Sequence, residues 1–226
     1  MKQYFKITSI FICLSLLAGL FFLFDVIYYH NSQYYYLLRN LLLAWIPLLL
    51  AFYLKKVLFK KTWSSYEAML VSFLWLLFIP NSFYMLSDYV HLNNFTGNNL
   101  LFNITFFSEI IITALMIGFF SVKIVESEIE NRFSKFWSKL IISLIFLLSS
   151  FGIYVGRDLR WNSWDILIKP GPLLLDVFYH LSNPFNYATI LTVVLSFFTL
   201  IFSFYYLVTN FGQKFSKINN FKQNEK

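Results

Sequence analysis

Six long apolar segments are the feature that most constrains how this chain can fold. Each approaches the roughly 20 residues that a helix needs to cross a hydrocarbon core about 30 Å thick. Helices are the only open structures that satisfy their own backbone polar groups in lipid. The expected spans cover residues 7–28, 34–54, 66–86, 100–122, 137–155 and 186–208. The predicted fold class is therefore an all-α polytopic membrane helix bundle with about six transmembrane helices plus short interfacial helices.

The composition excludes an ordinary soluble domain. Hydrophobic residues make up 58% of the 226 residues and charged residues only 13%, whereas about 25% of a typical globular chain is charged. So few charges cannot cover a surface exposed to water. No linker or repeat divides the chain, so we expect one integral membrane domain over residues 1–226, with a basic tail at about 209–226.

The distribution of basic residues predicts the orientation in the membrane. Lys and Arg in short loops resist translocation and mark the cytoplasmic side. Of the 18 basic residues, all but Arg39, Arg157, Arg160 and Lys169 fall on the side that carries both termini. We therefore expect both termini in the cytoplasm. The richness in Phe, Ile, Asn, Tyr and Lys suits an AT-rich bacterial genome, so the expected location is the plasma membrane of a bacterium. The basic tail is interpreted as an orientation anchor, so no nucleic-acid partner is predicted.

Polar side chains within or beside the spans gather on the predicted outer side. Such groups are costly in lipid unless they face protein, water or a partner, so they indicate an outward-facing polar pocket. For Asp25 and Arg39, snorkelling or mutual pairing is the alternative. The set comprises Asp25, Arg39, Asn40, Asn81, Tyr84, Asp88, Asn103, Arg157 and Arg160, together with His30, His91 and His180.

The inner side is expected to carry little beyond residues at the membrane edge. Its spans contain only edge lysines, Glu67 and a few hydroxyl groups. The connection at about residues 123–136 mixes three Glu with three basic residues and is predicted to be a solvated helical overhang without chemistry.

Glu109 lies near the middle of the fourth span. It is about nine residues from the outer end, hence roughly 13 Å deep at 1.5 Å per residue. Thr105, Ser108 and Thr113 lie at helical spacing from it, so this polar stripe should face the bundle. Glu109 is either a neutral or Arg-paired acid that fixes helix packing, or a functional carboxylate suited to proton transfer.

The third span ends in a polar segment that begins at Pro80. Pro80 removes a backbone donor and is expected to kink the helix. If the helix resumes, Asn81, Tyr84, Asp88 and His91 share one face at spacings of three, four and three. Asp88 and His91 could then perform acid/base chemistry or bind a metal, although such pairs also occur as ordinary polar caps.

A second polar segment, Gly156–Asp165, follows the fifth span and is predicted to form an interfacial helix. Guanidinium groups suit carboxylate or phosphate, and indoles suit the level of the headgroups. The alternative is an aromatic belt with local Arg/Asp pairs. The candidate ligand-binding residues in this segment are Arg157, Arg160, Trp161, Asn162, Trp164 and Asp165, of which all but Asn162 share an arc of about 140°.

A proline-rich turn should separate that helix from another. Pro170-Gly171-Pro172 is expected to end the interfacial helix, and a short helix should follow from Leu173 to Leu181. Asp176 and His180 lie four residues apart on it. With Asp88 and His91 they make a divalent-metal site conceivable, but the chain lacks an H-E-x-x-H motif and no cofactor is strongly implied.

The two polar segments resemble a family of bacterial multi-pass membrane proteins, the domain of unknown function 1361. Pro80-Asn81, Tyr84, Asp88 and His91-Leu92 match its P-N-x-x-Y-x-x-x-D-x-x-H-L element. Gly156–Asp165 is similar to its G-R-x-x-R-W-N-S-W-D element, which is the more specific of the two. The resemblance implies a membrane fold over nearly the whole chain and supports these site residues, but it supplies no reaction or substrate.

Three kinds of function are compatible with this pattern. The leading hypothesis is a pocket that binds a lipid headgroup, a lipid-linked intermediate or a small anionic ligand, with membrane lipids as partners. The second is a membrane-embedded enzyme acting on such a lipid, with His91, Asp88 or Glu109 as the acid or base, although no nucleophile motif such as G-x-S-x-G occurs. The third is a transporter or an accessory subunit, although the chain lacks an internal repeat. The sequence leaves the oligomeric state open.

Overall fold

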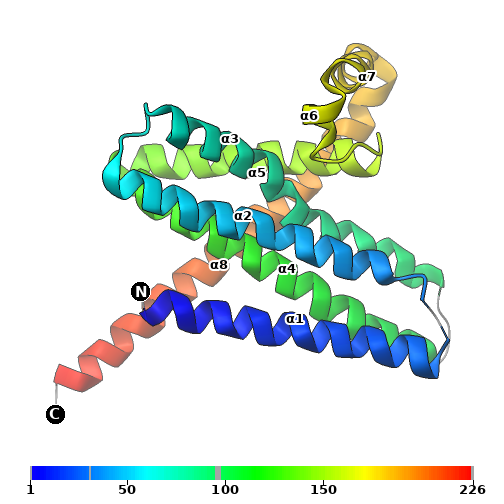
Figure 1. Ribbon diagram of the computed structural model, residues 1–226, viewed down its shortest axis with the longest axis horizontal. Coiled ribbons are helices and arrows are strands. Elements are labelled where there is room, and N and C mark those ends of the chain that lie inside the picture. The colour runs from blue at the N-terminus through cyan, green and yellow to red at the C-terminus, as the bar shows by residue number, and fades with distance from the viewer. Residues whose placement is uncertain (1, 31, 95–97, 225–226) are drawn as a thin grey trace.

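The computed structural model describes residues 2–30, 32–94 and 98–224, and every regular element in them is helical (Figure 1). Six helices are long and apolar enough to cross a membrane, which confirms the all-α polytopic fold class. The elements are α1 (Lys2–Tyr28), α2 (Tyr35–Lys60), α3 (Tyr66–Tyr84), the 3-10 helix η1 (Met85–Asn94), α4 (Asn98–Glu130), α5 (Lys135–Arg157), α6 (Asp165–Ile168), α7 (Pro170–Ser182), the 3-10 helix η2 (Pro184–Asn186) and α8 (Tyr187–Asn224).

The six long helices pack in a spatial order that differs from their order in the chain. α4 lies between α1 and α2, α3 packs on α2, and α5 joins α3 to α8. Both termini lie at one end of the bundle, which we call the terminal end (Figure 1). α6 and α7 stand apart at the opposite end, which we call the pocket end.

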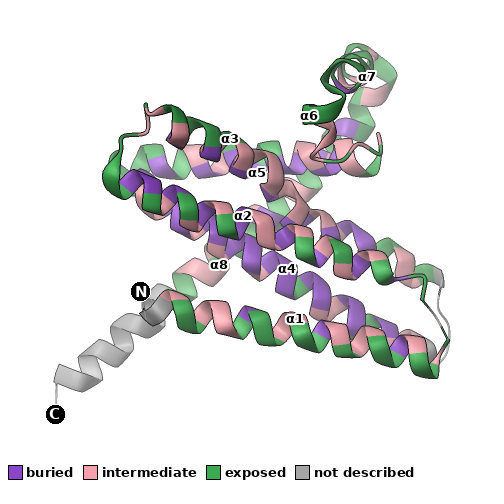
Figure 2. Cartoon of the chain, viewed as in Figure 1, coloured by how far each residue is buried: buried purple, intermediate pink, exposed green. Residues whose placement is uncertain are grey.

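The outer surface of the bundle is apolar, as a membrane protein requires. Phe5, Leu42, Leu101, Ile112 and Leu191 are each more than half exposed. Exposing such side chains to water is unfavourable in proportion to their area, whereas lipid tails solvate them well. The buried residues concentrate instead on the facing sides of α2 and α4 (Figure 2).

Hydrogen bonds from small polar side chains hold α3 against α2 and α4. The Trp75 indole donates to the Ser121 hydroxyl at 2.8 Å, and Ser121 donates to the Pro47 carbonyl at 2.9 Å. Nearer the pocket end, the Ser82 hydroxyl donates to the Ala44 carbonyl at 3.3 Å. Such bonds satisfy polar groups away from water, and here they place the end of α3 relative to its neighbours.

The terminal end confirms a helical overhang beyond the fourth span but corrects the expectation that it is solvated throughout and that the inner side is nearly apolar. α4 continues to Glu130, and Glu126 on it is only 4% exposed. The Tyr205 hydroxyl donates to the Glu126 carboxylate at 2.7 Å, and Lys123 also contacts this carboxylate. Tyr205 comes from α8 and also contacts the Phe119 ring on α4, so this burial depends on a helix that a reading of α4 alone does not reveal.

The proline-rich turn separates two short helices, as the sequence predicts. α6 ends at Ile168, and α7 begins at Pro170 instead of the predicted Leu173 and runs to Ser182. A proline in the first helical turn needs no backbone N–H partner and has a suitable φ already. Three residues further on, Leu173 is the buried residue of this helix.

Candidate functional site

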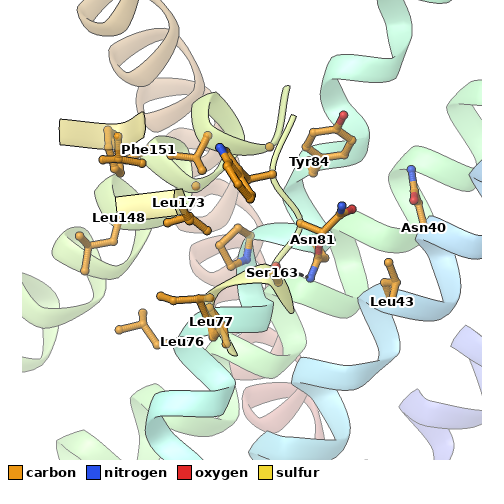
Figure 3. Close-up of a pocket in the computed structure, with 18 of the residues that line it drawn as sticks. Asn40, Leu43, Leu76, Leu77, Asn81, Tyr84, Leu148, Phe151, Ser163 and Leu173 are labelled. Carbon is orange, nitrogen blue, oxygen red and sulfur yellow. Dashed lines mark hydrogen bonds between the residues drawn. The ribbon is translucent and has the colours of Figure 1, made fainter. Parts of the chain in front are cut away.

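A cavity of about 560 Å³ lies at the pocket end, between α2, α3 and α5 and beneath the segment that carries α6 and α7 (Figure 3). Cavities of this size are typical of small-ligand sites. The residues that line it come from two stretches of the chain, 36–91 and 148–177. Its polar lining consists of Tyr36, Arg39, Asn40, Asn81, Tyr84, Asp88, His91, Trp161, Asn162 and Ser163.

The two polar segments converge at this cavity, as the sequence predicts. The Asn81 amide donates to the Ser163 hydroxyl at 3.0 Å and also to the Phe78 carbonyl at 3.2 Å (Figure 3). Gly156 lies so close to the Tyr84 ring that an added Cβ would be 3.3 Å from it. α3 and α5 thus bring the segments together through a direct bond and a close backbone approach.

The first segment reaches the cavity through a change of helix type. α3 continues through Pro80 to Tyr84, and the tighter 3-10 helix η1 follows from Met85. A 3-10 helix has three residues per turn, so Asp88 and His91 lie directly above one another. Both line the cavity, together with Asn81 and Tyr84 from α3.

The predicted interfacial helix over the second segment is wrong. α5 ends at Arg157, and Arg160 has a φ of 61°, in the left-handed region that a right-handed helix cannot contain. The Trp161 amide donates to the Val155 carbonyl at 3.2 Å and closes this turn over the end of α5. The common arc of arginines and indoles therefore does not exist.

Beyond this turn, Asp165 stabilises the approach to α6. Its carboxylate accepts from the Asn162 backbone N–H at 2.7 Å and from the Asn162 amide at 3.3 Å. Trp161 and Asn162 line the cavity, whereas Trp164 and Asp165 do not appear in its lining. Asp165 therefore stabilises the loop, while Trp161 and Asn162 of the same loop line the cavity.

Three exposed arginines lie at or beside the polar end of the cavity. Arg39 lines it, and Arg157 and Arg160 line an adjoining recess together with Tyr84 and Asp88. Arg39 and Arg157 both lie near enough to the Tyr84 hydroxyl to act on it electrostatically. None of the ion pairs found among the described residues involves any of these arginines. The local Arg/Asp pairs considered for the second segment are thus not formed there.

Asp88 is the most deeply buried charged residue of the site. It is 3% exposed, and its Oδ2 atom accepts no hydrogen bond from the part of the chain that the structure describes. The Asn40 amide interacts with its carboxyl group. Nearby, the His91 and Tyr36 rings are in edge contact, with centroids 5.9 Å apart. Asp88 and His91 are therefore accessible from the cavity but are not bound to each other.

The second acid/His pair fixes α7 to the bundle. The Trp161 indole donates to Asp176 Oδ2 at 2.7 Å, and His180 Nε2 lies 3.7 Å from Asp176 Oδ1. His180 Nδ1 is 3.3 Å from the Tyr154 hydroxyl. The described residues contain no group of three or more His, Cys, Asp or Glu side chains placed to hold a metal, so this pair and Asp88/His91 do not combine into one.

Two other predicted polar residues lie away from the cavity. Glu109 is half-buried, accepts from the Thr113 hydroxyl at 3.3 Å and contributes nothing to the cavity lining. Asp25 is 1% exposed, and no ion pair between Asp25 and Arg39 occurs among the described residues. Neither acid lines the cavity that contains Asp88 and His91.

Several lining residues were not assigned to the site from the sequence. Arg39 and Asn40 were noted only as outer polar groups, and Tyr36 was not singled out. Tyr36 and Asn40 are four residues apart, so their shared helical face was a usable signal. Ser163 lies inside the second segment, but only the bond from Asn81 reveals its role.

The comparisons with known proteins identify a family and no activity. The family model described as "Protein of unknown function (DUF1361)" matches residues 39–217, which is more than half of the chain and includes both polar segments. No curated protein and no solved structure matches the chain.

Proposed function

Because the chain belongs to the DUF1361 family, whose description states no activity, we propose a function from the geometry of the cavity. The protein is a multi-pass membrane protein that binds an anionic group in a pocket open to the outer side of a bacterial plasma membrane. The anionic group belongs to a lipid headgroup, a lipid-linked intermediate or a small anionic ligand.

The observation that carries this proposal is the set of guanidinium groups at Arg39, Arg157 and Arg160, which form no ion pair within the described part of the chain. Guanidinium groups form strong, often bidentate bonds with phosphate and carboxylate. The two nearby carboxylates, Asp88 and Asp158, leave the cluster with an excess of positive charge. Cations on the side where they are least expected are best explained by a ligand that needs them.

Replacing either Arg157 or Arg160 by Lys tests the proposal. Lysine retains the charge but lacks the planar fork, so a lost charged hydrogen bond of about 1.5–3 kcal/mol should weaken binding roughly 10- to 150-fold. The measurement is binding of the purified protein in detergent to a panel of anionic and zwitterionic lipids.

A matched control separates the site from the overall charge. Arg157→Gln and Lys60→Gln each remove one positive charge, and Lys60 is an exposed residue at the terminal end. Only Arg157→Gln should weaken binding. If both Lys variants at positions 157 and 160 bind like the parent at matched thermal stability, the segment is an interfacial anchor and the anion site is wrong.

Asp88 supports a second candidate, an enzyme that acts on such a lipid. Asp88 has a buried carboxyl oxygen that no described residue hydrogen-bonds, and His91 lines the same cavity. This arrangement suits general acid/base chemistry. Incubation of the protein with each bound lipid, followed by mass analysis, distinguishes the two functions. A chemically altered headgroup indicates turnover, and an unchanged one indicates binding alone.

A further inference from the structure

The cavity is divided into a polar and an apolar half, and we infer that its ligand is a lipid that enters sideways from the bilayer. The anionic headgroup occupies the polar half, and a hydrocarbon chain lies along α3 in the apolar half. This inference rests on the proposed function and adds the class of ligand and its route.

The division follows the axis of α3. Asn81 and Tyr84 stand at the polar half, whereas Leu76 and Leu77 face the apolar half with Leu148 (Figure 3). The lining of α3 extends from Tyr84 back to Phe73, eleven positions along the helix or about 16 Å. The apolar half is thus elongated and parallel to a membrane-spanning helix, and we call it the apolar arm. Its shape matches a hydrocarbon chain, whereas a small hydrophilic anion would not fill it.

The walls of the apolar half continue onto the lipid-facing surface. Phe73, Leu148 and Leu174 all line the cavity, yet they are 49%, 44% and 58% exposed. They come from α3, α5 and α7, so the arm is open on the side where these helices meet the bilayer. A ligand could therefore enter without leaving the hydrocarbon phase.

Two polar side chains of α7 point toward the bundle, and several of its apolar side chains point away from it. We therefore place the outer face of α7 in lipid and not in water. Its Asp176 and His180 bind or contact Trp161 and Tyr154, as described above. The opposite face is apolar and open, with Leu175 71% and Phe178 69% exposed. A helix with this arrangement is stable beside lipid tails and unfavourable in water.

Filling the apolar arm tests the inference. Leu148→Trp adds bulk inside the arm, and Leu144→Trp is the matched control, because Leu144 is 54% exposed one turn earlier on α5 and does not line the cavity. The protein is placed in phosphatidylcholine nanodiscs, and the probes are long-chain phosphatidic acid in the nanodisc and inorganic phosphate in solution. Leu148→Trp should weaken phosphatidic acid binding at least about tenfold, since added bulk excludes the chain. Leu144→Trp should bind both probes like the parent.

The probes also separate this inference from the proposed function. If Leu148→Trp and a second variant, Leu76→Trp, bind phosphatidic acid like the parent while Arg160→Lys weakens it, the apolar arm holds no chain and only this inference is wrong. If Arg157→Lys and Arg160→Lys change the binding of neither probe, the anion site itself is wrong. Phosphate binding retained by Leu148→Trp shows that the polar half is intact, as the inference requires.

Discussion

Arg160 shows at the scale of one residue how the site is built. Its φ of 61° is a conformation that glycine adopts freely but that costs other residues about 1–2 kcal/mol. The backbone N–H of Trp161 closes the turn that Arg160 forms. Arg160 also lines the recess beside Tyr84 and Asp88. An arginine at a position that favours glycine indicates that its side chain is needed there.

Arg160→Gly should therefore separate stability from binding. Removing the Cβ relieves the backbone strain, so the variant should unfold at the same temperature as the parent or at a higher one. Loss of the guanidinium group should at the same time weaken binding of an anionic lipid by about tenfold or more. Thermal unfolding and lipid binding are measured on the same preparation.

Arg160→Asn provides the control for this prediction, because asparagine also tolerates the left-handed region. It should match Arg160→Gly in binding and the parent in unfolding temperature. A clear fall in the unfolding temperature of both variants would show that the guanidinium group stabilises the turn instead.

At the scale of elements, the site depends on the parallel contact between α3 and α5. Gly152 approaches Pro80, and Gly156, one turn later, approaches Tyr84. Small residues spaced by four let membrane helices pack with their backbones close together. This contact holds Tyr84 beside the turn that carries Arg160, so the packing of two helices determines the geometry of the polar half.

Gly152→Ala should loosen this contact. An added Cβ would lie 2.9 Å from Pro80 Cγ and 3.0 Å from Pro80 Cβ, closer than packing allows, and the proline ring cannot rotate away. The expected loss of stability is about 1–3 kcal/mol, seen as a lower unfolding temperature in detergent. Gly19→Ala, where no atom lies within 4 Å of the added Cβ, should show no such loss. Equal unfolding temperatures for the two variants would contradict the role of the α3–α5 contact.

At the scale of the whole molecule, the proposed function requires that the pocket end of the bundle faces the outer side of the membrane. The terminal end holds Lys60, and the pocket end holds Asn162, and both side chains are exposed. In a background without the exposed Cys13, a cysteine at position 162 should react with an impermeant reagent in intact cells. A cysteine at position 60 should react only after permeabilisation, because the excess of basic residues at that end predicts that it faces the cytoplasm. Reversed labelling would place the pocket on the cytoplasmic side.

The sequence by itself determined the helical class and the general place of the polar residues. An apolar run of about 20 residues has essentially one stable solution in lipid, a helix that satisfies its own backbone, so local composition is sufficient. The same reasoning located both polar segments, because polar residues in spans must avoid lipid and therefore meet one another. The convergence of Asn81 with Ser163 follows from this constraint.

Only the tertiary structure decided which polar groups touch and how the backbone between the helices runs. Periodicity predicted a helix through Arg160, but the turn is held by a bond to Val155 and by the Trp161–Asp176 contact with α7. Likewise, the buried Glu126 accepts a hydrogen bond from Tyr205, which lies 79 residues further along the chain on α8. Local sequence patterns report the preferences of one segment, whereas these features depend on which distant segment packs against it.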